Sequence, residues 1–318
     1  MKTSLLIKGI FVFALATLLY GCTEDRPPLK DITVDRQSVS MIIGNREAIT
    51  ALPVPTNASN QAFEWSSSNP EIVTVSRFGI IEAVEEGSAT ITVREGNIQK
   101  TIPVTVIDPI QVPAEVGAWG FDDAANLTKA TTGQDLVAVG TGFTSIAGPN
   151  ATNGAVTVAR YSYFEVDHGI PLVPIALVPG LEGVTEYTLL FHIRAPVLGR
   201  WYTFYKTGPQ SVGDGEIFIN TNGQIGVGAT GYSTARITAN VWHKVVISVN
   251  LGSWIRFYLD GELIHTSNPI NDRFVLRDVF LLFADNDGED ADIDVAEVVL
   301  WDEALDNDQV RKVQRTRP

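Results

Sequence analysis

Short runs of alternating apolar and polar residues follow one another along most of this chain. The clearest are EYTLLFHIRA at residues 186–195, VWHKVVISVN at 241–250 and SWIRFYLDGELIHTS at 253–267. A period of two places successive side chains on opposite faces of a β-strand, so that one face can be buried while the other meets solvent. We therefore expect β-strands along the whole chain, with turns between them.

Turn sequences and the lack of helical pattern narrow the fold class. Asn222-Gly223 and Asp260-Gly261 separate alternating runs and are typical of two-residue hairpin turns. Only the segment at about 306–314 has a helical pattern. A chain with many strands and almost no helix has to pair its sheets to cover their edges and faces. The predicted fold class is all-β.

The length of 318 residues allows two domains. One group of β-rich runs occupies residues 31–107, and a second occupies residues 117–318. Residues 108–116, DPIQVPAEV, contain two prolines and predict a linker. Residues 22–30 are polar and proline-bearing, which favours a short tether. A hydrophobic content of 45% indicates a globular rather than a disordered chain.

The first group carries a recognisable sequence motif. WSSSNPEIVTVSRFGIIEAVEEGSATITV, residues 65–93, resembles the bacterial Ig-like family, group 2. The resemblance implies a small Ig-like β-sandwich in which Trp65 packs in the core and Gly87 lies in the turn before the last strands. Modules of this family usually serve as spacers or adhesive stalks.

The second group contains three landmarks in order, namely AWGFDDAANL at 118–127, WHKVVISVNLGSWIRFYLDGELI at 242–264 and IDVAEVVLWDEALDNDQV at 293–310. Together they resemble laminin-G-like, pentraxin-like modules of the concanavalin A-like fold. The resemblance implies a two-sheet jelly roll. Most of its members bind glycans or proteins, often with a bound calcium ion.

The first 22 residues have the pattern of an export signal. Lys2 and Lys8 flank the start of an apolar run, 9–21, that is too short for a membrane span. LYGC at 19–22 resembles the lipobox of bacterial lipoproteins, which implies cleavage after residue 21 and acylation of Cys22. Cys22 is the only cysteine of the chain, so it has no internal disulfide partner. We expect an outer-membrane lipoprotein of the bacterial cell envelope, exposed at the surface; the alternative is a plain signal peptide.

The hexapeptide DIDVAE, residues 292–297, allows a catalytic interpretation. It resembles the E-x-D-x-x-E strand of glucan hydrolases that share the concanavalin A-like fold. That resemblance implies Asp292 as nucleophile, Asp294 as its orienting partner and Glu297 as acid/base of a retaining glycosidase. Asp292 is one methylene shorter than the glutamate of that motif, and the motif lies mid-chain in those enzymes. Catalysis is therefore the alternative, and a non-catalytic protein is the prediction.

A metal site is the other interpretation of these carboxylates. The carboxylates at 285–294 repel one another unless some of their charges are neutralised. A calcium ion could neutralise them, because calcium prefers oxygen ligands. On a regular strand Glu297 shares a face with an apolar row formed by Ile293, Val295, Val299 and Trp301, where it needs a partner. The resemblance places a calcium ion near the first and last strands, which implies a cluster of Asp122, Asp123 and Glu297. The alternative is a solvated acidic loop, with Glu297 paired to backbone amides or to an arginine.

Aromatic residues are the candidates for sugar recognition, because ring faces stack on the apolar faces of pyranoses. Trp201, Tyr202, Tyr205 and Tyr232 are the candidate ligand-binding residues. The alternative is that alternate members of the set fill the core.

Charge and motif context exclude several other partners. The net charge of −14 repels nucleic acid and anionic lipid. GVGATG at 226–231 matches a nucleotide-binding pattern but leads into a strand rather than a helix, so no nucleotide site is expected. The sequence predicts a lipid-anchored envelope protein whose Ig-like spacer carries a carbohydrate-binding module with calcium, recognising a glycan or a surface protein. A purely structural or adhesive protein is the remaining alternative.

Overall fold

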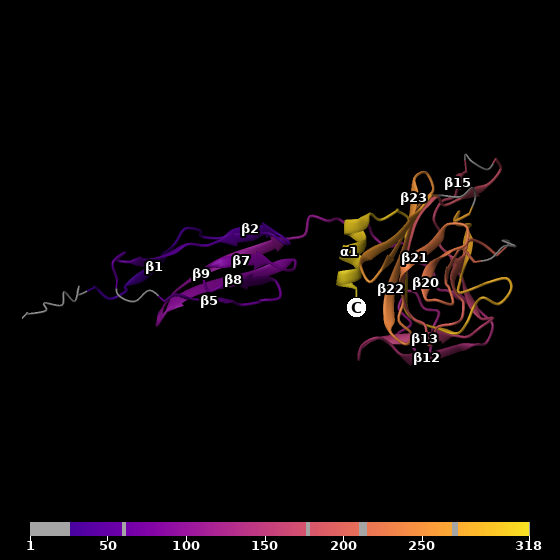
Figure 1. The fold of residues 1–318 in the computed structure, drawn as a ribbon, viewed down its shortest axis with the longest axis horizontal. Helices are drawn as coiled ribbons and strands as arrows, with labels where there is room; N and C mark the ends of the chain where they lie inside the picture. The colour runs from indigo at the N-terminus through magenta and orange to yellow at the C-terminus, as the bar shows by residue number, and fades with distance from the viewer. Residues whose placement is uncertain (1–25, 59–61, 176–178, 210–214, 269–272, 318) are drawn as a thin grey trace, which may run out of the picture. The chain divides into compact units, whose positions relative to one another are not determined.

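The computed structural model describes residues 26–58, 62–175, 179–209, 215–268 and 273–317, and it divides the chain into two compact units, residues 1–109 and 110–318 (Figure 1). Regular structure is almost entirely β, which confirms the predicted class. Among the described residues the α-helix α1 (Asn307–Thr316) is the only one. None of the described segments forms an apolar helix long enough to cross a membrane.

The first unit is a small β-sandwich. Its strands are β1 (Asp31–Val34), β2 (Val39–Ile42), β3 (Arg46–Ala48), β4 (Ala51–Val54), β5 (Glu64–Ser67), β6 (Val73–Val75), β7 (Ile80–Ala83), β8 (Gly87–Glu95) and β9 (Ile98–Ile107). One sheet has the order β2-β9-β8-β5, another has β3-β7-β6, and β1 pairs with β4. Alternate residues of β8 and β9 are buried between the sheets, as a period of two requires. Trp65 of β5 packs against this core.

The second unit contains most of the strands. In chain order they are β10 (Gly117–Trp119), β11 (Val137–Val139), β12 (Phe143–Ala147), β13 (Gly154–Val158), β14 (Tyr163–Asp167), β15 (Val173–Pro174), β16 (Glu182–Gly183), β17 (Glu186–Arg194), β18 (Tyr202–Lys206), β19 (Ile217–Ile219), β20 (Gln224–Val227), β21 (Gly231–Arg236), β22 (Trp242–Asn250), β23 (Trp254–Leu259), β24 (Glu262–Ser267), β25 (Val279–Leu282) and β26 (Ile293–Trp301).

Two large sheets enclose the core of this unit. The eight-stranded sheet has the order β12-β13-β26-β17-β22-β23-β24, with β10 paired to β26. The seven-stranded sheet has the order β11-β14-β25-β18-β19-β20-β21. Inward residues of both sheets form one apolar cluster, to which β17 contributes Leu189 and Phe191 and β22 contributes Val245 and Ile247. This arrangement is the two-sheet jelly roll that the sequence predicts.

Helix α1 covers the outer face of the eight-stranded sheet. It begins with a capping box, in which the Asp306 carboxylate accepts from the backbone N–H groups of Asp308 and Gln309. Its apolar side packs on outward residues of β17, β22 and β26; the cluster is Ala118, Leu190, Val246, Tyr258, Val299, Trp301, Leu305, Val310 and Val313. The helix therefore buries the part of the outer face on which it lies.

Residues 110–115, expected to be part of a linker, are attached to the second unit. Lys312 Nζ donates to the Ile110 carbonyl at 2.8 Å, and Gln309 Nε2 donates to the Gln111 carbonyl at 2.8 Å. Trp301 Nε1 donates to the Pro113 carbonyl at 3.2 Å. The proline-rich composition predicted a break in regular structure, but it does not reveal that side chains of α1 hold this segment.

A β-bulge at Ala296 determines which residues of β26 point into the core and which lie on the outer face of the sheet. His192 of β17 lies opposite Glu297, whereas the next residue, Ile193, lies opposite Val295, so Ala296 has no partner in this pair. One extra residue reverses the alternation. As a result Val295 and Val298 both face the core, while Glu297 lies on the outer face. The predicted face shared by Glu297, Ile293 and Val295 is wrong for this reason; Val299 and Trp301 do share the face of Glu297.

Both predicted hairpin turns form, although one differs in type. Asp260 and Gly261 connect β23 to β24 and both have positive φ, +49° and +92°, as a two-residue type I′ turn requires. At Asn222-Gly223 the backbone N–H of Gly223 donates to the carbonyl of Asn220, and the N–H of Asn220 donates to that of Gln224. That loop is one residue longer, and only Gly223 of the pair has positive φ.

Candidate functional site

An acidic loop, residues 284–292, joins β25 in one sheet to β26 in the other. Asp285 anchors it, because one carboxylate oxygen accepts from the Gly215 N–H at 3.0 Å and the other accepts from the N–H groups of Asp287 and Glu289. Burial opposes ionisation of Asp285, but these backbone donors outweigh it and hold its pKa below the usual value. The loop is therefore built around an ionised carboxylate.

The turn between β13 and β14 binds the other side of the acidic loop. Asp290 accepts from the backbone N–H of Tyr161 at 2.8 Å, and Asp292 accepts from the backbone N–H of Arg160 at 2.8 Å. The Arg160 guanidinium donates to the carbonyl of Gly288 at 2.7 Å. Burial raises the pKa of Asp290, and the Tyr161 amide opposes that shift.

These contacts hold Tyr161 in an unusual conformation. Its φ is +66°, in the left-handed region that costs a non-glycine residue about 1–2 kcal/mol. The residue is 67% exposed, and the Arg160 guanidinium lies 4.6 Å from the centroid of its ring. An exposed aromatic ring fixed at a strained backbone position is typical of binding sites. The sequence offered no signal for this feature, since nothing in RYSY indicates a left-handed tyrosine.

Of the four aromatic residues predicted to bind a ligand, two are buried and two are half-buried. Tyr202 and Tyr205 are buried, the first donating to the Val197 carbonyl and the second hydrogen-bonded to the Tyr187 hydroxyl at 2.8 Å. Their assignment as ligand-binding residues is wrong, because both lie in the core of the sandwich. Trp201 and Tyr232 are half-buried, with ring centroids 6.2 Å apart. The Trp201 carbonyl accepts from the Ala291 N–H at 3.0 Å, which places this pair beside the acidic loop.

The predicted metal cluster does not assemble. Asp122 accepts from the Gly154 N–H at 2.7 Å, and Asp123 accepts from the Ala125 N–H at 2.9 Å, while Glu297 lies on the outer face of the sheet. Among the described residues, the acidic or histidine group whose possible ligand atoms all lie within 4.8 Å of one another is Asp285, Asp287 and Glu289. The bulge at Ala296 and the local turn at residues 122–125 account for the difference.

Glu297 is paired to an arginine, which was one of the alternatives. Arg317, just after α1, donates to its carboxylate at 2.5 Å and also pairs with Glu115 at 3.1 Å. Burial raises the pKa of Glu297, and the Arg317 charge opposes that shift. Lys244 lies nearby, its ammonium donating to the carbonyls of Gln314 and Arg317 at the end of the helix. Glu297 thus forms an ion pair that holds the end of α1 on the sheet.

The three residues of the catalytic alternative are occupied elsewhere. Asp292 accepts from the Arg160 amide, and Asp294 accepts from Arg194 at 2.9 Å and from Thr157 at 2.6 Å. Glu297 is bound to Arg317. A retaining glycosidase needs two carboxyl groups that face one glycosidic bond in an open cleft. In the described part of the chain, none of the three lines the cleft between α1 and the outer face of the eight-stranded sheet.

Comparison with protein families agrees with the division into two units. Residues 28–106 match the bacterial Ig-like domain, group 2. Residues 181–311 match the concanavalin A-like lectin/glucanases superfamily.

Curated relatives match only part of the chain. A polysaccharide lyase 8 family protein of Enterococcus faecalis is 41% identical over 73 residues, which is 22% of this chain and 5% of that protein. An uncharacterized protein of Clostridium acetobutylicum is 38% identical over 71 residues, 21% of this chain and 18% of that protein. The chain thus spans less than a fifth of the length of either relative.

Two solved structures are also similar. Domain 4 of an extracellular arabinanase of Geobacillus stearothermophilus, in complex with arabinotriose, has a TM-score of 0.46 and 16% identity, covering 63% of this chain and 98% of that one. The binding domain of botulinum neurotoxin serotype D has a TM-score of 0.44 and 14% identity, covering 64% of this chain and 52% of that one.

Proposed function

We propose that this chain, in which a bacterial Ig-like domain precedes a concanavalin A-like domain, is a lipid-anchored recognition protein of the bacterial cell envelope. The second domain binds carbohydrate without cleaving it, and the Ig-like domain is its spacer. Residues 1–21 and Cys22 lie outside the described residues. Acylation of Cys22 and exposure at the surface of the outer membrane are parts of the proposal that rest on the sequence pattern.

The observation that carries the proposal is the Arg160–Tyr161 pair on the acidic loop. An exposed ring offers a flat apolar surface to the C–H face of a pyranose. The stacked guanidinium and the loop carboxylates supply the charged donors and acceptors that bind sugar hydroxyls strongly. Because Asp290 and Asp292 fix the backbone of the pair, little conformational entropy is lost on binding.

Calcium is the proposed cofactor of the same loop. Asp285, Asp287 and Glu289 bring carboxylate oxygens within 4.8 Å of one another, and a cation among them would be attracted by all three charges. Hard carboxylate ligands suit calcium. When bound, the ion would stabilise the loop that positions Tyr161 and would supply a positive charge that attracts sugar hydroxyls.

The Tyr161→Asn variant tests the sugar-binding surface. Asparagine tolerates positive φ, so the turn is retained while the ring is lost. We expect affinity for the responding glycan on a panel of glucose, mannose, xylose and arabinose hexasaccharides to fall at least about tenfold, a loss of about 1.4 kcal/mol, as measured by isothermal titration calorimetry. The thermal transition should stay within about 3 °C of the parent.

The Ig-like domain provides the matched control. Phe78 is 69% exposed, and the Arg77 guanidinium lies 4.6 Å from the centroid of its ring. Phe78→Asn therefore removes an arginine–aromatic pair like that of Arg160 and Tyr161, but in the other domain. This variant should bind like the parent. If the parent and both variants bound the glycan with equal affinity, Tyr161 would not be part of the binding surface. If the parent bound none of the hexasaccharides, carbohydrate binding would be contradicted.

Calcium titration tests the cofactor. The chain without residues 1–22, first treated with a chelator, should bind one calcium ion with a dissociation constant of about 10⁻⁴–10⁻³ M, the range of extracellular modules. Asp287→Asn combined with Glu289→Gln should abolish the heat of calcium binding, because two of the three carboxylate charges are lost. Asp122→Asn is the control and should bind normally. If Asp122→Asn alone abolished binding, the ligand set would instead be the one expected from sequence.

A further inference from the structure

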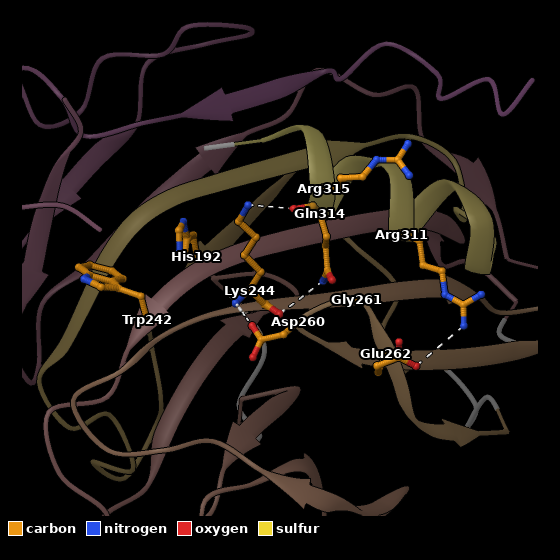
Figure 2. Close-up of a pocket in the computed structure, with 9 residues that line it drawn as sticks. All are labelled: His192, Trp242, Lys244, Asp260, Gly261, Glu262, Arg311, Gln314 and Arg315. Atoms are coloured by element: carbon orange, nitrogen blue, oxygen red, sulfur yellow. Dashed lines mark hydrogen bonds and ion pairs between the residues drawn. The ribbon is translucent and has the colours of Figure 1, made fainter. Parts of the chain in front are cut away.

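A cleft of about 400 Å³ lies between the outer face of the eight-stranded sheet and α1 (Figure 2). Strand β17 contributes His192, β22 contributes Trp242 and Lys244, the β23–β24 turn contributes Asp260, Gly261 and Glu262, and α1 contributes Arg311, Gln314 and Arg315. The volume is in the range of pockets that hold small ligands. No residue of the acidic loop is among these lining residues.

The cleft wall is rigid where the turn and the helix end meet. Asp260 accepts from the His243 ring at 2.7 Å and from the Lys244 amide at 2.9 Å. Burial opposes ionisation of Asp260, but these donors outweigh it and lower its pKa. Lys244 also lines the cleft, and its ammonium donates to the Gln314 carbonyl at 3.0 Å. The polar groups of the wall are therefore fixed in position by the fold.

One buried acceptor in the cleft lacks a donor. Gln314 is only 8% exposed, and its Oε1 has no hydrogen-bond partner among the described residues. Its Nε2 makes one long contact, 3.4 Å, with the Lys244 carbonyl. A Cβ on Gly261 would come within 3.3 Å of Oε1, so the orphaned oxygen lies beside the turn that lines the cleft. A buried carbonyl without a donor costs about 1–3 kcal/mol, so rotation of the Gln314 amide toward a ligand O–H in the cleft would be favourable.

The two ends of the cleft differ in chemistry. Figure 2 shows Trp242 and His192 at one end, Arg311 and Glu262 at the other, and Gln314 between them. The Trp242 ring is half-buried, with the Arg194 guanidinium 4.9 Å from its centroid. Arg311 and Glu262 approach only to 3.9 Å and are exposed, so this pair is weak and can reorganise around a ligand.

The lining contains both donors and acceptors and is nearly balanced in charge. Lys244, Arg311 and Arg315 are cationic, and Asp260 and Glu262 are anionic. Such a lining gives little selective field for an ion, whereas hydroxyl groups both donate and accept and match it well. An indole at one end suits the apolar face of a sugar ring. We infer that this cleft is a second carbohydrate-binding site, which takes a neutral pyranose unit. The inference rests on the proposed function, since it adds a site to a glycan-binding domain.

NMR titration of the chain from Cys22 to Pro318 tests the site. The probes are the methyl glycosides of glucose, galactose, mannose and xylose at up to about 50 mM, well above the millimolar dissociation constants of weak sites. At least one should shift the Trp242 indole N–H and the Gln314 side-chain amide signals together and saturably. If neither signal responds to any of the four glycosides, the inference is overturned.

Two variants separate this site from the acidic loop. Gln314→Met should weaken the response of the Trp242 indole at least tenfold while raising Tm by about 2 °C, because the orphaned carbonyl is removed. Tyr161→Asn should leave that response unchanged. If instead Tyr161→Asn abolished the response and Gln314→Met did not, the second site would be wrong and the proposed function would stand. A Trp242 response without any effect of Tyr161→Asn on hexasaccharide binding would support the cleft and contradict the acidic-loop site.

Discussion

Replacing Arg317 with alanine is expected to lower the free energy of unfolding of the second domain by about 3 kcal/mol at pH 7.5. The guanidinium holds Glu297 and Glu115 together. The side chains of Arg317 and Glu297 are only 18% and 17% exposed, so solvent screens the pair poorly. Without Arg317 a buried carboxylate remains next to Lys244 alone, and removal of one partner of a buried pair is costly because the other stays desolvated.

The loss of unfolding free energy in Arg317→Ala should increase with pH. Burial raises the pKa of Glu297 in the folded protein, and Arg317 is the main opposing influence. In the variant this pKa therefore rises further above its value in the unfolded chain. A carboxyl group whose folded pKa is raised binds its proton more tightly when folded, so stability falls as pH increases through that window. The deficit should be largest above pH 7 and should shrink as the pH is lowered toward 5.

Calorimetric unfolding at several pH values measures this effect. At pH 7.5 the transition of the second domain should move down by roughly 6–12 °C. Arg311→Ala on α1 is the control, because the ion pairs of Arg311 with Glu262 and Asp308 are exposed and 3.9 Å long. It should change stability by less than about 0.5 kcal/mol. A deficit for Arg317→Ala that stays constant from pH 5 to pH 8 would show that Glu297 is not the group left unpaired.

Deletion of Val298 is expected to abolish cooperative folding of the second domain. In β26 the bulge allows Val295 and Val298 to face the core together. Without Val298 the strand can keep its pairing with β17 only if Glu297 takes the inward position, between Val295 and Leu300. An unpaired carboxylate at the centre of an apolar core is too costly for a domain of marginal stability.

Deletion of Ala296 is the matched control at the same strand. Removing the unpaired residue leaves Val295 directly before Glu297, and regular alternation then places Val295 inward and Glu297 outward, as in the parent. We expect this protein to fold, with a loss of about 1–2 kcal/mol from the altered bulge geometry. Near-ultraviolet circular dichroism and thermal unfolding distinguish the two outcomes. Equal melting of both deletion variants would show that β26 tolerates either register.

The sequence was sufficient for the architecture because the architecture depends on local patterns. Alternation in residues 186–195 and 241–250 specified the central strands β17 and β22, and Asp260-Gly261 specified a hairpin. Family resemblance gave both sandwiches, and the matched families agree. The Asp306 cap likewise marked the start of α1.

The site was less predictable because its geometry depends on irregularities and on distant partners. A single extra residue, Ala296, moved Glu297 away from the expected calcium ligands. Its partner Arg317 is 20 residues away, beyond the helix. Tyr202 and Tyr205 belong to an aromatic-rich stretch of the kind that can form a binding surface, yet both side chains are buried in the core of the sandwich. Tyr161 depends on carboxylates about 130 positions later in the chain, and no local pattern encodes such a contact.

The attachment of residues 110–115 to α1 and Arg317 has a consequence for modularity. Glu115 and Arg317 are in direct contact at 3.1 Å, so the polypeptide enters and leaves the jelly roll at nearly the same point. A domain with adjacent ends can be inserted into a surface loop of a host protein with little loop-closure entropy, and it can be circularly permuted without new long connections. The jelly roll is thus suited to insertion into an unrelated scaffold through short connections.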